Sequence, residues 1–247
     1  LTYTDHFRIG ADELPALVMA DNHIPFHHAD MHERAMEIAE NRGIKTLVVC
    51  GDLVDNHFLA SKTGKPASES DVGGDEAYER VEAVLGEFVK VFRRVYYVPG
   101  NHDAWISRVL DATIKFERLA RMFMPQAGAQ RIKVSRFHYC DVGEWRLTHP
   151  KNYGQRSTTV PLRLVEKKGR PVIVFHQHTS GLEFDRGGTI PGVAMGGMMD
   201  PSKMLYIQEK DSTNPAWQNE FGIIGKDNIL ERFIDNRYLT DWKEALA

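Results

Sequence analysis

Residues whose side chains bind metals or move protons stand in short groups, at or just beyond the ends of predicted strands. On an extended segment, residues two apart project to the same side, so a pair with that spacing can offer two ligands to one ion. Mixed carboxylate, amide and imidazole ligands suit Mn²⁺, Fe²⁺ or Zn²⁺ better than Ca²⁺. The groups are Asp21-x-His23, Gly51-Asp52, Gly100-Asn101-His102, His149 and His176-x-His178.

This many ligands is enough for two divalent ions about 3.5–4 Å apart, as in two-metal hydrolases. One carboxylate must then bridge the ions. Asp52 is our candidate, because the apolar run Thr46–Cys50 predicts a buried strand that ends in a tight turn at Gly51. For any single histidine a structural role is the default interpretation, but chance placement explains the whole set poorly. A purely structural site is disfavoured, because such sites are usually closed zinc centres rich in cysteine.

Apolar runs before these groups predict the strands that must position them. An open α/β sheet binds its ligands at the carboxyl ends of its strands, so these runs would bring the groups to one edge. Three shorter alternating runs, Arg131–Ser135, Phe137–Cys140 and Trp145–His149, predict antiparallel strands. The buried runs are Leu14–Ala20, Thr46–Cys50, Val95–Val98 and Val172–Phe175.

Helical periodicity predicts the elements between the strands. The helices expected are Met31–Ala39 with a C-terminal glycine at Gly43, Glu76–Phe92, Ala104–Met122 and Ser157–Lys168. Ser61–Asp75 is expected to be an exposed loop, and Gly181–Asp200 loops with short strands. Tyr206–Gln208 and Phe221–Ile224 are candidate closing strands, and no element is assigned from Asp227 onward.

The composition fits one globular domain that spans residues 1–247. A net charge of −3 argues against a strongly basic nucleic-acid-binding surface, although a local one stays open. The only cysteines are Cys50 and Cys140, and Cys50 falls in a predicted buried strand, so we expect reduced thiols and a cytoplasmic protein. No apolar run approaches the roughly 20 residues of a membrane span. The chain begins with Leu1 rather than Met, so further residues can precede it.

The ordered groups resemble the signature of the calcineurin-like metallophosphoesterases. The sequences around Asp21 and His102 are similar to those of phage and bacterial family members that are often likened to repair exonucleases. The resemblance covers Ala20 to His178 and implies an α/β fold, a two-sheet α/β sandwich flanked by helices. The residues that carry it are Asp21-x-His23, Gly51-Asp52-x-x-Asp55, Gly100-Asn101-His102-Asp103, His149 and His176-x-His178.

The resemblance implies a role for each of these residues. His102 would stabilise the phosphoryl transition state or protonate the leaving oxygen, with Asp55 holding its ring, while a metal-bridging hydroxide attacks phosphorus. Asp103 is expected to support its neighbours rather than bind metal. The first ion would be held by Asp21, His23, Asp52 and His178, and the second by Asp52, Asn101, His149 and His176. Mn²⁺ is the first choice for both ions, with Fe²⁺ or Zn²⁺ as alternatives.

Two positions depart from the family pattern, since Phe175 replaces the usual glycine before His176, and Pro150 follows His149. His178 favours phosphodiester or nucleotide-type substrates, because the family's protein phosphatases lack this histidine. Phosphomonoesterase or protein phosphatase activity is the alternative, and a non-catalytic protein-binding scaffold is the alternative of another class.

Candidate contacts to the substrate phosphate, or to a nucleotide or nucleic acid, lie close in sequence to these motifs. A role as solvent-exposed loop or helix-face residues is the competing interpretation for each of them. Nothing in the sequence encodes the oligomeric state. The candidates are Arg108, Lys151, Asn152 and Arg156.

Overall fold

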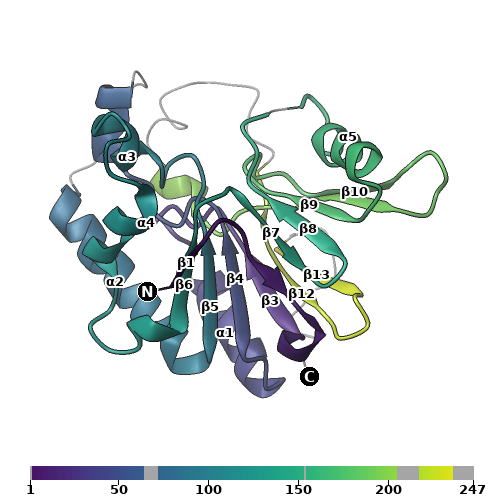
Figure 1. Ribbon diagram of the computed structural model, residues 1–247, viewed down its shortest axis with the longest axis horizontal. Coiled ribbons are helices and arrows are strands. Elements are labelled where there is room, and N and C mark those ends of the chain that lie inside the picture. Colours follow the sequence, from purple (N-terminus) through teal and green to yellow (C-terminus); the bar gives the residue numbers. More distant parts are fainter. Residues whose placement is uncertain (1, 64–71, 153, 205–216, 236–247) are drawn as a thin grey trace.

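The parallel strands predicted around Asp52 form the centre of the first of two sheets (Figure 1). The computed structural model describes residues 2–63, 72–152, 154–204 and 217–235. Within them the first sheet has the order β1-β6-β5-β4-β3-β12-β13, with β12 and β13 antiparallel to their neighbours. Its strands are β1 (Thr2–Thr4), β3 (Ala16–Met19), β4 (Thr46–Cys50), β5 (Arg94–Val98), β6 (Ile132–Ser135), β12 (Asn219–Ile224) and β13 (Leu230–Asp235).

The second sheet has the order β10-β11-β9-β8-β7-β2 among the described residues. It is mixed, because β8 pairs antiparallel with β7 and parallel with β9. Its strands are β2 (Arg8–Ile9), β7 (Tyr139–Val142), β8 (Trp145–Thr148), β9 (Val172–Val174), β10 (Gly181–Phe184) and β11 (Pro191–Ala194).

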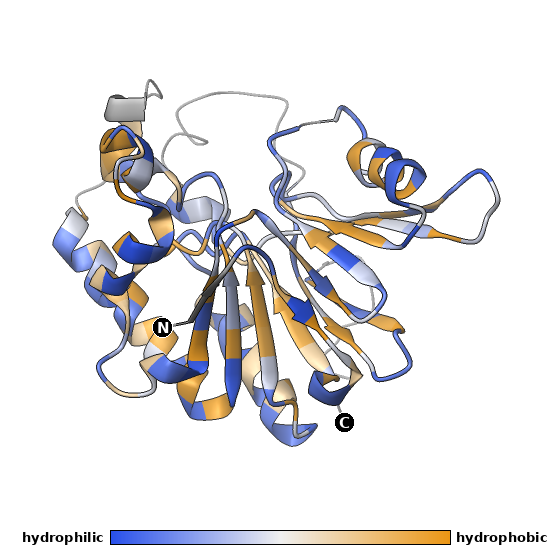
Figure 2. Ribbon diagram, in the orientation of Figure 1, coloured by the Kyte–Doolittle hydropathy of each residue, from blue (hydrophilic) through white to orange (hydrophobic). Residues whose placement is uncertain are grey.

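Side-chain alternation along the central strands decides how the layers pack. In β4, Leu47 and Val49 belong to a core shared with the helices, whereas Val48 and Cys50 belong to a core shared with the second sheet. Residues of opposite parity in a strand face opposite sides of the sheet, so both faces of β4 are buried. Figure 2 shows hydrophobic residues concentrated along these strands. The two-sheet α/β sandwich expected from the sequence is confirmed.

The helices cover the outer faces of the two sheets (Figure 1). Helix α1 turns its buried face, which includes Met31, Ala35 and Ile38, to the first sheet, and the chain leaves it at Gly43 with φ +65°. Helix α5 packs Val160 and Val165 on β9 of the second sheet. The helices are α1 (Ala29–Asn41), α2 (Gly74–Val91), α3 (Trp105–Val109), α4 (Phe116–Leu119) and α5 (Thr159–Lys168).

The single helix expected over Ala104–Met122 is wrong. The chain instead forms α3, α4 and a 3-10 helix, Ala120–Phe123. Asp111 and Ala112 adopt left-handed φ values of +50° and +54°, which no α-helix accommodates. Leu110 and Ile114 are exposed, so the apolar stripe does not continue across this turn and packing does not hold it helical.

Other expectations also need correction. The run Arg131–Ser135 was expected to be antiparallel, but β6 pairs in parallel with both β1 and β5, because α3 and α4 form a crossover from β5. Strand β13 lies where no element was assigned, and Ser61–Thr63 ends a 3-10 helix, His57–Thr63, rather than beginning a loop. Tyr206–Gln208 lies outside the described residues.

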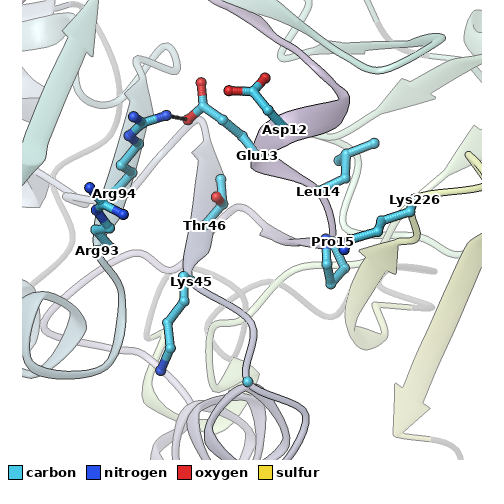
Figure 3. A pocket seen from close by; sticks show the side chains of 10 residues that line it. Asp12, Glu13, Leu14, Pro15, Lys45, Thr46, Arg93, Arg94 and Lys226 are labelled. Carbon is cyan, nitrogen blue, oxygen red and sulfur yellow. Dashed lines mark ion pairs between the residues drawn. The ribbon is translucent and has the colours of Figure 1, made fainter.

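A cavity of about 380 Å³ opens at the amino ends of β3, β4 and β5 (Figure 3). Thr46 and Arg93 line it, and an ion pair of 2.6 Å joins Arg94 Nη1 to Glu13 Oε2 at its wall. The metal-ligand groups follow the carboxyl ends of the same strands, so this cavity and those groups lie at opposite edges of the sheet. Among the described residues, no helix is both long and apolar enough to cross a membrane.

Candidate metal centre

The carboxyl ends of five strands bring the sequence-predicted groups together. The first sheet supplies the segments after β3, β4 and β5, and the second supplies those after β8 and β9. The candidate centre therefore spans the junction between the two sheets. Its residues are Asp21 and His23 after β3, Asp52 and Asp55 after β4, Asn101 and His102 after β5, His149 after β8, and His176 and His178 after β9.

Asp21 connects both sheets at this junction. Its Oδ1 lies 3.1 Å from Nε2 of His149 and 3.1 Å from Nε2 of His178, while Oδ2 accepts a 3.0 Å hydrogen bond from the backbone N–H of His176. Burial opposes ionisation of this carboxyl group, but His178 and His149 outweigh it and hold the pKa of Asp21 well below its usual range.

Asp52 lies between His23, which follows a strand of the first sheet, and His149, which follows a strand of the second. Its Oδ2 is 3.3 Å from Nε2 of His149 and 3.9 Å from Nε2 of His23, and its Oδ1 accepts a 2.7 Å hydrogen bond from the backbone N–H of His102. Burial again opposes the charge, but His149 and His102 lower the pKa of Asp52 far below that of a free carboxyl group. Asp52, like Asp21, therefore lies close to histidines from both sheets.

Oδ1 of Asp55 contacts two histidines rather than one. This atom lies 2.7 Å from Nδ1 of His23 and 3.1 Å from Nδ1 of His102, whose Nδ1 is also 2.8 Å from the backbone oxygen of Asp55. Since acceptors face both Nδ1 atoms, the protons belong there, and Nε2 of neutral His23 presents a lone pair. Asp52 and Asp55 overcome burial and raise the pKa of His102 to about 9.

The donor atoms fall into groups that fit divalent ions. Within each group the ligand atoms lie within 4.8 Å of one another. Nε2 of His23 and Nε2 of His178 approach to 3.3 Å, and a cation between them would satisfy both lone pairs. Asn101 Oδ1 is buried and has no hydrogen-bond partner among the described residues, as suits a ligand oxygen. The two groups without Asp55 are Asp21, His23 and His178, and Asp52, His149 and His176.

The backbone at these positions is unusual. Non-glycine residues rarely adopt positive φ, and such strain collects at functional sites. Here it aims side chains from the strand ends into one volume. No sequence pattern revealed it. The candidate ligands with positive φ are Asp21 (+51°), His23 (+47°), Asp52 (+46°), His176 (+87°) and His178 (+56°).

Two motif glycines permit the close approach of these segments. A Cβ at Gly51 would lie 2.0 Å from the His149 ring, and a Cβ at Gly100 would lie 2.1 Å from Oδ1 of Asp52. Both separations are far below van der Waals contact. Phe175, the departure from the family pattern, is buried in the core between the sheets and leaves His176 beside Asp21.

Aromatic residues flank the histidines. The Trp105 ring stacks on His102 with centroids 4.0 Å apart, and the Trp217 ring meets His178 edge-on at 4.4 Å. Trp105 lies three residues after His102, and this spacing is a sequence signal that could have indicated its place at the site. Trp217 carried no such signal, because it is distant in sequence from every motif.

The candidate substrate residues are less well gathered. Burial and then His149 lower the pKa of His138 to about 4, and the exposed cations Lys151 and Arg108 add to this effect, so both lie within electrostatic range of His138. Asn152 and Arg156 are exposed on the segment between β8 and α5. Among the described residues, no hydrogen bond or ion pair joins the side chains of these four to the candidate ligands, so their contact with substrate stays a prediction.

Comparison with known proteins identifies the arrangement. A family model described as calcineurin-like phosphoesterase matches residues 14–195, which include every candidate ligand. The chain belongs to the calcineurin-like phosphoesterase family. As a member of this family it is a phosphoester hydrolase, and its His and Asp groups provide for divalent metal binding. No curated protein matches the chain.

Several solved structures are similar to this calcineurin-like phosphoesterase at low sequence identity. A metallophosphoesterase from Sphaerobacter thermophilus is 12% identical with a TM-score of 0.46, over 90% of this chain and 89% of that chain. Yfce, a phosphoesterase from E. coli, is 16% identical with a TM-score of 0.45, over 90% and 100%. Vps29 from Entamoeba histolytica is 14% identical with a TM-score of 0.39, over 90% of this chain and 100% of that chain.

Proposed function

We propose that this phosphoesterase hydrolyses phosphodiesters or nucleotide-type substrates at a centre of two divalent ions. The observation that carries the proposal is the position of Asp52, between His149 of one donor group and His23 of the other. Asp52 would be the shared ligand. The first ion would be held by Asp21, His23, Asp52 and His178, and the second by Asp52, Asn101, His149 and His176.

The donor set points to the metal. Imidazole nitrogens and carboxylate oxygens in mixed groups suit Mn²⁺ first, with Fe²⁺ and Zn²⁺ as alternatives. When bound, such ions acidify water and draw charge from phosphoryl oxygens. The chain's own residues then orient the substrate and move protons.

His102 would supply the proton to the leaving oxygen. Its Nδ1 is held by Asp55, which leaves Nε2 as the group able to donate. A pKa of about 9 keeps the ring protonated near neutral pH, as a general acid requires. Arg108 and Lys151, which act electrostatically on His138, would supply positive charge to the substrate's phosphate.

Two features support a diester substrate. His178, which the protein phosphatases of the family lack, is present and lies 3.1 Å from Asp21, so the first donor group is complete. The cations Arg108 and Lys151 would suit an anionic group next to the scissile phosphate. A preference for monoesters, as in a phosphomonoesterase or protein phosphatase, is the outcome that would redirect the assignment.

The test compares hydrolysis of bis-(p-nitrophenyl) phosphate with that of p-nitrophenyl phosphate, after chelation and after return of Mn²⁺, Fe²⁺ or Zn²⁺. Asp52→Asn should abolish turnover and weaken metal retention, whereas His102→Ala should abolish turnover and keep the metal. Arg186→Ala is the control, because its side chain is 97% exposed. Wild-type turnover in Asp52→Asn would refute the two-ion centre. Bound metal without turnover of either substrate would favour a protein-binding scaffold.

A further inference from the structure

Asp103 is a buried carboxylate that the proposed reaction does not use. It directly follows His102 and has no exposed surface. Its Oδ1 accepts hydrogen bonds from the backbone N–H of Val54 at 2.9 Å and from the hydroxyl of Tyr97 at 2.6 Å. Its Oδ2 accepts from the backbone N–H of Gly100 at 2.7 Å and, at 3.4 Å, from that of Leu53.

These donors come from two different loops. Leu53 and Val54 directly follow Asp52 in the loop after β4, whereas Gly100 directly precedes Asn101 in the loop after β5. Backbone N–H groups that donate to a carboxylate form hydrogen bonds roughly twice as strong as neutral pairs. One side chain therefore joins the loop that carries Asp52 to the loop that carries Asn101 and His102.

Two further contacts run between the same loops. The backbone N–H of His102 donates to Asp52 Oδ1 at 2.7 Å, and the side-chain amide of Asn56 donates to the backbone oxygen of His102 at 3.0 Å. The backbone at Gly100 leaves no room for a Cβ beside Asp52. These contacts fix the separation of the two loops. The Asp103 carboxylate accepts hydrogen bonds from backbone N–H groups of both loops.

We infer that Asp103 is a positioning residue that sets the distance from Asp52 to Asn101 and His102. The inference rests on the proposed function, because this distance matters to a shared ligand, a second-ion ligand and a proton donor. A carboxylate is required for geometric reasons. An asparagine keeps one acceptor oxygen, and its NH₂ group would face a backbone N–H from one of the two loops.

Asp103→Asn should therefore separate the loops while leaving the ligands intact. Groups that orient metal ligands typically account for 10–100-fold in affinity or activity. We expect Mn²⁺ binding to weaken by that factor, and kcat to fall with KM little changed. Saturating Mn²⁺ should restore occupancy but not kcat, because His102 remains displaced. Tyr97→Phe is the matched control, since it removes the donor that belongs to neither loop.

The experiment combines Mn²⁺ titration calorimetry, steady-state kinetics and amide hydrogen exchange on the whole chain. In metal-free Asp103→Asn, the Val54 or Gly100 amide should exchange at least tenfold faster than in Tyr97→Phe, at similar melting temperatures. If Asp103→Asn does not fold, Asp103→Glu keeps both oxygens but shifts them by about 1.5 Å, and should show the same selective loss of affinity.

Equal Mn²⁺ affinity and equal exchange in Asp103→Asn and Tyr97→Phe would overturn the inference. Loss of affinity only in proportion to a lower melting temperature would also overturn it, because that is a general effect on stability. Failure of the wild-type chain to bind Mn²⁺, Fe²⁺ or Zn²⁺, or to turn over either substrate with any of them, would refute the proposed function instead. The exchange comparison in metal-free protein would still decide the role of Asp103.

Discussion

Asp55 Oδ1 lies 2.7 Å from Nδ1 of His23, closer than it lies to Nδ1 of His102. The carboxylate expected to orient the proton donor therefore also orients a candidate metal ligand. A histidine that binds metal through one nitrogen commonly donates from the other to a carboxylate, which fixes the ring and strengthens the ligand. Under the proposed mechanism, metal affinity and proton transfer would both depend on this one carboxylate.

Asp55→Asn should impair metal binding and turnover together. We expect Mn²⁺ affinity and kcat each to fall by about 10–100-fold, because the neutral amide lacks the negative charge that strengthens the hydrogen bonds from both Nδ1–H groups. His102→Gln should lower kcat alone. Adding Asp55→Asn to His102→Gln should still weaken Mn²⁺ binding in calorimetry. Unchanged affinity in that double variant would show that Asp55 does not orient His23.

Gly100→Ala should disable the centre through one methyl group. The new Cβ would lie 2.1 Å from Asp52 Oδ1 and 2.3 Å from Asp52 N, so the loop after β4 must move. We expect at least a 100-fold loss of metal-dependent hydrolysis, measured with the diester substrate. Gly86→Ala, in α2 with nothing within 4 Å of its Cβ, should keep full activity and raise stability by about 0.5–1 kcal/mol. Equal activity in both variants would contradict this packing argument.

His102 should make the stability of the metal-free protein depend on pH. Its pKa is raised to about 9 from the usual 6.5, so its contribution is fully present below pH 6.5 and is lost as pH rises through 9. The difference in unfolding free energy between wild type and His102→Gln should therefore shrink across this window. Urea titrations at intervals between pH 6 and pH 10, with chelator, would measure it. A constant difference would contradict the raised pKa.

Phe175→Ala should destabilise the fold rather than improve the site. The side chain is fully buried between the sheets, and truncation of a buried phenylalanine costs about 3–5 kcal/mol. Phe184→Ala is the control, because its side chain is 49% exposed and its loss should change stability by about 0.5 kcal/mol or less. Urea unfolding distinguishes them. Equal stabilities would mean that Phe175 does not support the inter-sheet core.

The strands and their ligand groups could be predicted because both depend on local signals. The run Thr46–Cys50 is apolar on both faces, and β4 is buried on both faces. Order and spacing of the motifs grouped Asp21, Asp52 and His176 in one site, which the structure places at the junction of the two sheets. These features need only the chain's own periodicity and the parallel arrangement of the sheet.

The remaining features depend on contacts between distant segments. The break at Asp111 follows from the lack of a packing partner for Leu110 and Ile114, which propensity does not report. Likewise, β13 pairs with β12 across a short turn although its residues are only partly buried, so its apolar pattern is weak. Nothing in the sequence around Asp103 indicates that its hydrogen-bond donors come from two loops.

The candidate centre takes Asp21 and Asp52 from one sheet and His149 and His178 from the other, above the apolar junction of the two. Ions held there would bind residues of both sheets at once. Ion binding would therefore stabilise the packing of one sheet on the other. At a free concentration of 100 times its Kd, an ion stabilises the folded state by about 2.7 kcal/mol. The melting temperature of this protein would then serve as a gauge of its metal content.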